Sequence, residues 1–138
     1  MAIPISEEIK ALLDRANFAH LATLMPDGSP LVTPVWVGRE GDRILVATGD
    51  GTLKARNAKR DPRVGLSIID FEDPYSEAQI RGRVIERRPD QDLATMDVIS
   101  RKYTGREFPF RSPAGRVVLV IEVERARYNK LPFKHTPG

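Results

Sequence analysis

Residues 48–57, Thr-Gly-Asp-Gly-Thr-Leu-Lys-Ala-Arg-Asn, bring together residue types that bind an anion. The two glycines let a ligand approach the backbone closely, and the residues after them are expected to begin a helix. The unpaired N–H groups and the partial positive charge of a helix N-terminus attract phosphate. Thr52 adds a hydroxyl group, and Lys54 and Arg56 add two cations. The segment therefore favours a site for the phosphate of a nucleotide-like cofactor.

The two cations also have a simpler explanation. Lys54 and Arg56 do not share a helix face, so both reach one anion only if it lies near the helix end. The alternative is an ordinary solvated turn followed by a basic first turn of helix. Cations at the start of a helix are locally unfavourable, however, so their presence without a partner favours the anion site.

Composition excludes several kinds of chemistry. The sequence has no cysteine, which excludes disulfides, thiol catalysis, zinc–thiolate sites and cysteine-ligated iron–sulfur clusters. Only two histidines are present, and no metal site is predicted. The formal net charge of +3 permits an anionic ligand but does not predict nucleic acid as a partner. No triad or pair of acids stands out, so no catalytic residue is assigned.

The chain is expected to form a single cytoplasmic domain over residues 1–138. No apolar run approaches the roughly 20 residues that a membrane-spanning helix needs. Residues 1–5 lack the basic region and apolar core of a secretory signal. Neither a membrane nor a secretory route is therefore predicted.

Strands must position the anion-binding segment, because most of the chain has strand-like patterning. Strands are predicted over residues 18–24, 31–37, 43–48, 63–70, 75–87 and 117–128. The hairpin-length connections between the first three predict an antiparallel meander. Helices are predicted over residues 6–17, near 52–60 and over 90–103, with a tail over 129–138. Antiparallel strands in this number avoid free edges by closing up, so we expect a small, mainly β barrel.

Some residues predict local features of this barrel. Pro34 removes a ladder donor and predicts an edge or a bulge in its strand. Gly82 predicts a kink or bulge in the strand over 75–87. Trp36 either fills the barrel or stacks on a ligand ring, and the two interpretations weigh equally. Residues 104–114 form either a substrate lid or a loop packed over the barrel end.

Three segments carry a resemblance to a known family. Residues 21–24, 26–30 and 33–37 resemble the opening hairpin of the split-barrel flavin-binding family related to pyridoxamine 5′-phosphate oxidase. Residues 54–57 with 60–64 resemble the phosphate-binding helix of its branch that uses the deazaflavin coenzyme F420. Residues 79–84 resemble a further strand motif of the family. The resemblance runs from about residue 18 to residue 123 in the expected order.

The resemblance implies a split β-barrel of six to seven antiparallel strands with flanking helices, like FMN-binding proteins. It also implies a homodimer with two cofactor sites at the subunit interface. The residues that would lie beside the coenzyme ring are Val35, Trp36, Val37, Ala47 and Thr48. Those that would hold its phosphate and the chain beyond it are Thr52, Lys54, Ala55, Arg56, Asn57 and Arg60. Tyr75 and Gln79 lie where the family brings residues across from the partner subunit.

The implied function is an F420-dependent oxidoreductase that transfers a hydride between the deazaflavin and a small organic acceptor. FMN is the alternative coenzyme, and a flavin-binding or haem-binding barrel without turnover is an alternative function. A nucleic-acid-binding barrel is a third, but the scattered aromatic residues and the low net charge disfavour it. Residues 127–133 do not match the C-terminal segment of the branch that oxidises vitamin B6, so that reaction is not expected. The acceptor is not identified.

Overall fold

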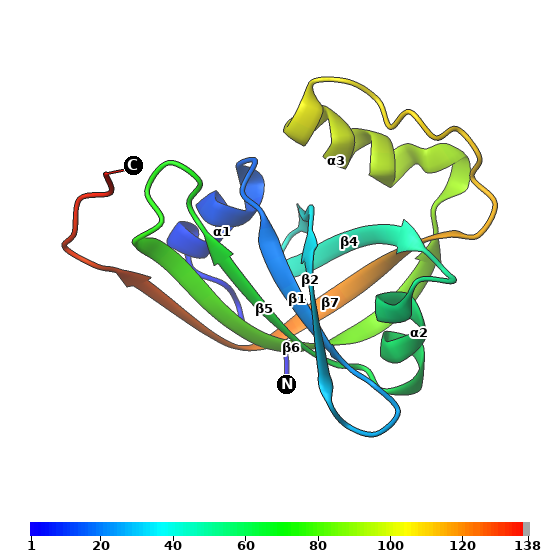
Figure 1. Cartoon of the computed structure of the whole chain (residues 1–138), viewed down its shortest axis with the longest axis horizontal. Coiled ribbons are helices and arrows are strands. Elements are labelled where there is room, and N and C mark those ends of the chain that lie inside the picture. Colours follow the sequence, from blue (N-terminus) through cyan, green and yellow to red (C-terminus); the bar gives the residue numbers. More distant parts are fainter. Residues whose placement is uncertain (137–138) are drawn as a thin grey trace.

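The computed structural model describes residues 1–136 and contains one seven-stranded antiparallel sheet with three α-helices (Figure 1). The strand order is β2-β1-β5-β6-β7-β4-β3. The strands are β1 Ala19–Leu24, β2 Pro30–Val35, β3 Gly38–Glu40, β4 Arg43–Gly49, β5 Arg63–Ile69, β6 Ser76–Pro89 and β7 Arg116–Lys130. The helices are α1 Glu7–Asp14, α2 Leu53–Arg60, the short η1 Gln91–Leu93 and α3 Ala94–Thr104.

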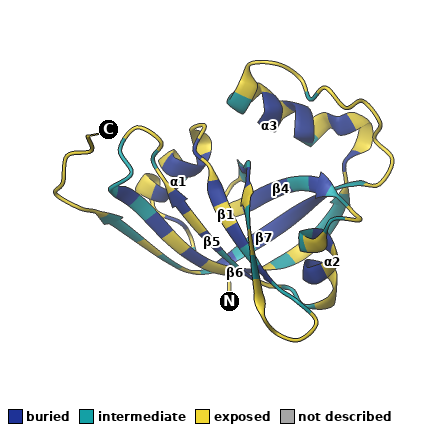
Figure 2. Cartoon of the chain, viewed as in Figure 1, coloured by how far each residue is buried: buried dark blue, intermediate teal, exposed yellow. Residues whose placement is uncertain are grey.

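The mainly β split barrel that the sequence predicts is confirmed. The long strands β6 and β7 run through the middle of the sheet, and buried and exposed residues alternate along the first half of β6 (Figure 2). The buried face encloses the main core, to which α1 adds Ile9, Leu12 and Leu13. Such alternation is typical of a strand with one face on the core and one on the surface.

The predicted meander of the first three strands is wrong. β1 and β2 form a hairpin, but β2 does not pair with β4. The neighbours of β4 are β7 and the short β3. Trp36 and Val37 carry the chain from the β2 edge of the sheet to the β3 edge. Val37 is completely buried at this crossing. The segment leads into the pairing of β3 with β4 and does not form a hairpin between β2 and β4.

The two predicted irregularities are confirmed. β2 lies at the edge of the sheet, where Pro34 costs no inner ladder bond. The register between β6 and β7 shifts at Arg81 and Gly82, which marks a bulge. A Cβ atom on Gly82 would collide with the carbonyl oxygen of Glu122, so glycine is required by close backbone approach.

Three element boundaries differ from the prediction. α1 ends at Asp14, not at residue 17, because the buried Asn17 amide donates to the Leu12 carbonyl oxygen (2.9 Å) and turns the chain. The helix predicted over residues 90–103 is divided into η1 and α3, since Asp92 and Leu93 both have positive φ. β7 continues to Lys130, so the tail begins at residue 131. Residues 137–138 of the predicted tail lie outside the described residues.

α3 packs on the outside of the sheet beside β4 (Figure 1). Leu93, Met96 and Ile99 form its buried stripe, as predicted. At its C-terminal end, Lys102 Nζ donates to the carbonyl oxygens of Leu13 (2.7 Å) and Val37 (2.5 Å). These bonds tie α3 to α1 and to the crossing between the sheet edges. Along residues 1–136, no helix is long and apolar enough to cross a membrane.

Candidate functional site

A pocket of about 440 Å³ opens where the end of β2, the end of β4, the start of α2 and one side of α3 meet. Its lining residues come from six separate segments of the chain. They are Phe18, Pro34, Val35, Trp36, Ala47, Thr48, Gly49, Thr52, Lys54, Met96, Ile99, Phe108 and Arg116. Among the residues that the sequence singled out, Val35, Trp36, Ala47, Thr48, Thr52 and Lys54 meet here.

One side of the pocket is apolar and aromatic. The Trp36 ring stacks on Tyr103, with ring centroids 5.2 Å apart and planes 7° from parallel. Met96 and Ile99 add side chains from α3, and Phe108 adds a ring from the loop that follows α3. This side suits a flat, largely apolar ring. Trp36 is half-buried and packs against the α3 cluster outside the main core, so it does not fill the barrel. It also lines the pocket, and its stacking on a ligand ring stays a prediction.

The other side of the pocket carries two cations, Lys54 and Arg116. Burial, and next the positive charge of Arg116, lower the pKa of Lys54. The Arg116 Nε atom is buried without a hydrogen-bond partner, and the guanidinium lies over the Phe108 ring at 5.1 Å. No carboxylate of residues 1–136 forms an ion pair with either cation, since the nearby Asp50 pairs with Arg87. Two unneutralised cations in a half-buried pocket favour an anionic ligand.

Hydroxyl groups and open space lie beside these cations. Thr52 caps α2, because its Oγ1 accepts from the Ala55 N–H (3.4 Å). The Thr48 and Thr52 hydroxyls are 3.2 Å apart, so α2 begins directly at the pocket. A Cβ atom on Gly49 would lie 3.8 Å from an Arg116 nitrogen, so a side chain there would enter this space. Cations, hydroxyls, a helix start and a glycine-lined space together fit the phosphate of a cofactor.

The other residues predicted on α2 lie outside the pocket. Ala55 is buried under the helix, and Arg56 is exposed. The buried Asn57 donates to the Thr23 hydroxyl (3.1 Å) and accepts from Arg60 (2.9 Å). Arg60 also donates to the Leu24 carbonyl oxygen. Asn57 and Arg60 therefore attach α2 to β1, and within one chain they do not reach the pocket.

Three further predicted residues also lie elsewhere. Val37 is buried in the main core. Tyr75 packs against Phe133 and His135 (centroids 5.3 and 6.3 Å apart), in the β5–β6 connection at the other end of the sheet from α2 (Figure 1). Gln79 points to the outer face of the sheet. A partner subunit would be needed to bring Tyr75 or Gln79 to the pocket, and that contribution stays a prediction.

Gln79 lines a second, shallow hollow of about 560 Å³ on the outer face of β1, β5, β6 and β7. Ala22 and Gly65 make its floor, and Arg81 lies directly opposite Arg125 beside it. The hollow is larger than the pocket beside α2 and also has arginines beside it, but no Phe, Tyr or Trp ring lines it. The pocket beside α2 is the better ligand site, because its cations lie beside Trp and Phe rings and at the start of a helix.

Sequence reasoning did not identify Arg116, Met96, Ile99 or Phe18 as site residues, and it included Phe108 only within the loop 104–114, as part of a substrate lid or of a packed loop. Arg116 is the first residue of β7 and reaches Lys54 only because β7 pairs with β4. The phosphate signal around Lys54 lies in one continuous segment, whereas Arg116 is distant in sequence and has no motif around it. The one signal that the sequence offers for Arg116 is a cation next to the strand predicted over 117–128, and such a signal is not specific.

The chain is similar to proteins of one family. The family model described as pyridoxamine 5′-phosphate oxidase matches residues 5–130. A solved F420 reductase is 32% identical, with a TM-score of 0.80 over 91% of this chain and 98% of that chain. Rv2991 of Mycobacterium tuberculosis (23% identical, TM-score 0.74, 99% and 94% covered) and general stress protein 26 of Bacillus anthracis (16%, 0.70, 89% and 92%) share the fold. No curated protein matches the chain.

Proposed function

Because the chain belongs to the pyridoxamine 5′-phosphate oxidase family, we propose that it is an oxidoreductase that binds coenzyme F420 in the pocket between α2 and α3. FMN is the alternative coenzyme. The bound coenzyme would exchange a hydride with a small organic acceptor. The proposal rests above all on the pair of cations, Lys54 and Arg116, that lies in a pocket with an aromatic side and without a carboxylate from residues 1–136.

The phosphate would lie at the cationic side of the pocket. Lys54 and the Arg116 guanidinium supply N–H donors there, and the Thr48 and Thr52 hydroxyls lie next to them. Burial and then the charge of Arg116 lower the pKa of Lys54, and an anion bound beside the amine would favour its charged form. Each charged hydrogen bond that forms in this half-buried place contributes about 1.5–3 kcal/mol.

The coenzyme ring would lie on the apolar side, against Trp36 and the side chains of α3. Tyr103 supports the far face of Trp36, since its hydroxyl donates to the Asn17 carbonyl oxygen (2.5 Å) and accepts from the Val37 N–H (3.1 Å). A side chain held from behind in this way presents its free surface in one orientation. The chain's part in the reaction is to bind, orient and exclude water, while the coenzyme supplies the redox chemistry.

Two features favour the deazaflavin over FMN. The F420 reductase shares 32% of its residues with this chain over nearly the full length of both. F420 also carries an anionic tail beyond its phosphate, and Arg56 and Lys59 are exposed cations on α2, the helix that begins at the pocket. Exposed cations such as these attract the carboxylates of a coenzyme tail.

We also propose that the protein is a homodimer with a site at each subunit interface. The pocket is open to solvent on one side, and the outer face of β1, β5, β6 and β7 is uncovered by any helix of the described chain. Arg81 and Arg125 face each other on that surface although like charges repel, so a partner or an anion there would relieve them. Sedimentation analysis would test the dimer; a monomer at all concentrations would contradict it.

The binding test is a fluorescence titration of the purified protein with F420 and with FMN, side by side. We expect saturable binding of F420, and weaker or comparable binding of FMN. Lys54→Ala should weaken binding by about 1–3 kcal/mol, because a charged hydrogen bond is lost. Arg63→Ala is the matched control, since Arg63 is an exposed cation paired with Asp61 outside the pocket. Failure of the wild-type protein to bind either coenzyme would refute the proposal.

A further inference from the structure

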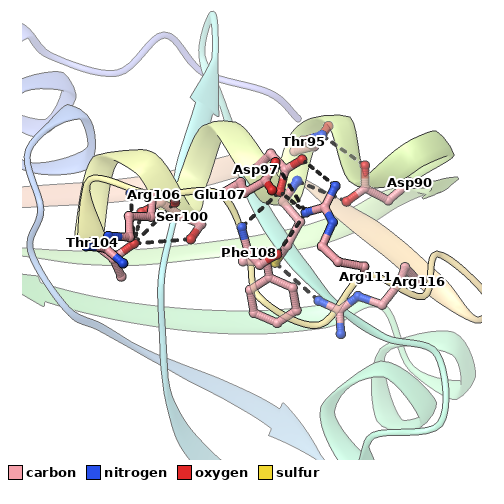
Figure 3. Close-up of polar contacts among 11 residues, drawn as sticks. Asp90, Thr95, Asp97, Ser100, Thr104, Arg106, Glu107, Phe108, Arg111 and Arg116 are labelled. Carbon is pink, nitrogen blue, oxygen red and sulfur yellow. Dashed lines mark hydrogen bonds and ion pairs between the residues drawn. The ribbon is translucent and has the colours of Figure 1, made fainter.

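The loop after α3, residues 105–115, is held by one carboxylate (Figure 3). Asp97, on α3, is only 8% exposed. Its Oδ1 accepts from the Phe108 N–H (2.9 Å) and from Arg111 Nη1 (2.8 Å), and its Oδ2 accepts from Arg111 Nη2 (3.2 Å). Arg111 Nη1 also donates to the Phe108 carbonyl oxygen (2.8 Å). Asp97 and Arg111 thus grip both backbone polar groups of Phe108.

The gripped residue forms part of the candidate pocket. The Phe108 ring lines the pocket and lies against the Arg116 guanidinium, as Figure 3 shows. Arg116 also reaches α3 directly, because its Nη2 lies 3.2 Å from the Met96 sulfur. The guanidinium is therefore held between the Phe108 ring and the residue that precedes Asp97.

The hydrogen bonds to Asp97 include two charge-assisted bonds from Arg111. A nearly buried carboxylate is costly unless it is fully bonded, and here it accepts one backbone and two guanidinium bonds. The hydrogen bond from Arg111 is the main reason that the pKa of Asp97 is lowered. The loop has no regular secondary structure, so these bonds determine where Phe108 lies.

We propose that Asp97 is a positioning residue: together with Arg111 it holds Phe108 against Arg116 and so directs the Arg116 guanidinium toward the anionic group of a bound coenzyme. This inference rests on the proposed function. The loop is then a fixed wall of the pocket. Asp97 acts on the bound phosphate indirectly, through Phe108 and Arg116. A carboxylate that only stabilised the loop would affect all ligands of the pocket alike.

The test compares ligands with and without the phosphate. FMN is compared with riboflavin, and F420 with its phosphate-free deazaflavin nucleoside, by fluorescence titration. In Asp97→Asn we expect a roughly tenfold or greater loss of affinity for the phosphate-bearing ligand, the scale of one charged hydrogen bond, with little change for the phosphate-free one. Arg111→Gln removes the same grip from an exposed position and should act alike if Asp97→Asn folds poorly.

Glu107→Gln is the matched control. Glu107 lies on the same loop and makes a longer, exposed contact with Arg111 (3.9 Å), which leaves the bonds to Asp97 in place. It should change neither affinity. Trypsin should cleave after Arg106 faster in Asp97→Asn than in the wild-type protein, because the loop is released.

Two results would overturn the inference. They are an unchanged affinity ratio within a ligand pair, which includes equal losses for both ligands, and unchanged cleavage after Arg106. If wild-type protein binds neither coenzyme, the proposed function fails and this inference fails with it. If wild-type protein binds and the ratio does not move, only the inference fails.

Discussion

Arg116→Met should move coenzyme affinity and ligand-free stability in different directions. In the ligand-free protein the buried Arg116 Nε has no partner, and its charge contributes to the lowered pKa of Lys54. A bound phosphate would offset the positive charge of both Lys54 and Arg116. Methionine has a similar length and no polar atom to leave unpaired, so it keeps the packing against Phe108 and Met96 while it removes the charge.

The size of each effect follows from these contacts. Loss of one charged hydrogen bond to phosphate costs about 1.5–3 kcal/mol, which is about ten- to a hundredfold in affinity. Removing a buried, unpaired donor gains about 1–3 kcal/mol in the ligand-free protein. Loss of the contact between the guanidinium and the Phe108 ring costs about 0.5–1 kcal/mol. We therefore expect ligand-free stability to stay equal or to rise by up to about 2 kcal/mol.

Three measurements check this prediction. Fluorescence titration gives the affinity for F420 or FMN, and urea unfolding without ligand gives the free energy of unfolding. Titration of the Lys54 amine by NMR should show a higher pKa in Arg116→Met than in the wild-type protein. A variant that loses ligand-free stability but keeps full affinity for the phosphate-bearing coenzyme would refute the reasoning, because Arg116 would then be a structural residue.

Other predictions concern the ring side of the pocket and the frame around it. Trp36→Leu should weaken FMN and riboflavin equally, by about 1 kcal/mol, because it removes an aromatic surface supported by Tyr103 and no phosphate contact; a loss confined to FMN would contradict it. Gly82→Ala should lower the free energy of unfolding by about 1–3 kcal/mol, since a Cβ would meet the Glu122 carbonyl; an unchanged urea midpoint would contradict it. Burial lowers the pKa of Lys102 from 10.5 to about 8. Between these pH values the unfolded chain binds more protons than the folded one, so the free energy of unfolding should rise with pH from about 8 to 10. In Lys102→Met this rise should be smaller, and equal slopes for the two proteins would contradict the assignment.

Local patterns predicted most of the elements correctly. Alternating apolar residues identify strands such as β5 and the first half of β6, because one face of each lies on the core, and continuous apolar runs identify β4 and β7. Pro34 and Gly82 identify the sheet edge and the bulge, since each has a backbone limit that holds in any fold. Thr52 before Leu53 identifies the start of α2, because a side chain must satisfy its first N–H groups.

Pairings between distant segments could not be predicted in this way. The sequence alone favoured a meander, since short connections usually join neighbouring strands, but β4 pairs with β7. That pairing brings Arg116 to Lys54, and the grip of Asp97 then brings Phe108 to Arg116. The sequence by itself determined the elements and one half of the proposed phosphate site, because both depend on neighbours along the chain. Only the tertiary structure decided the second cation and the aromatic wall, because contacts between residues far apart depend on how the whole sheet closes.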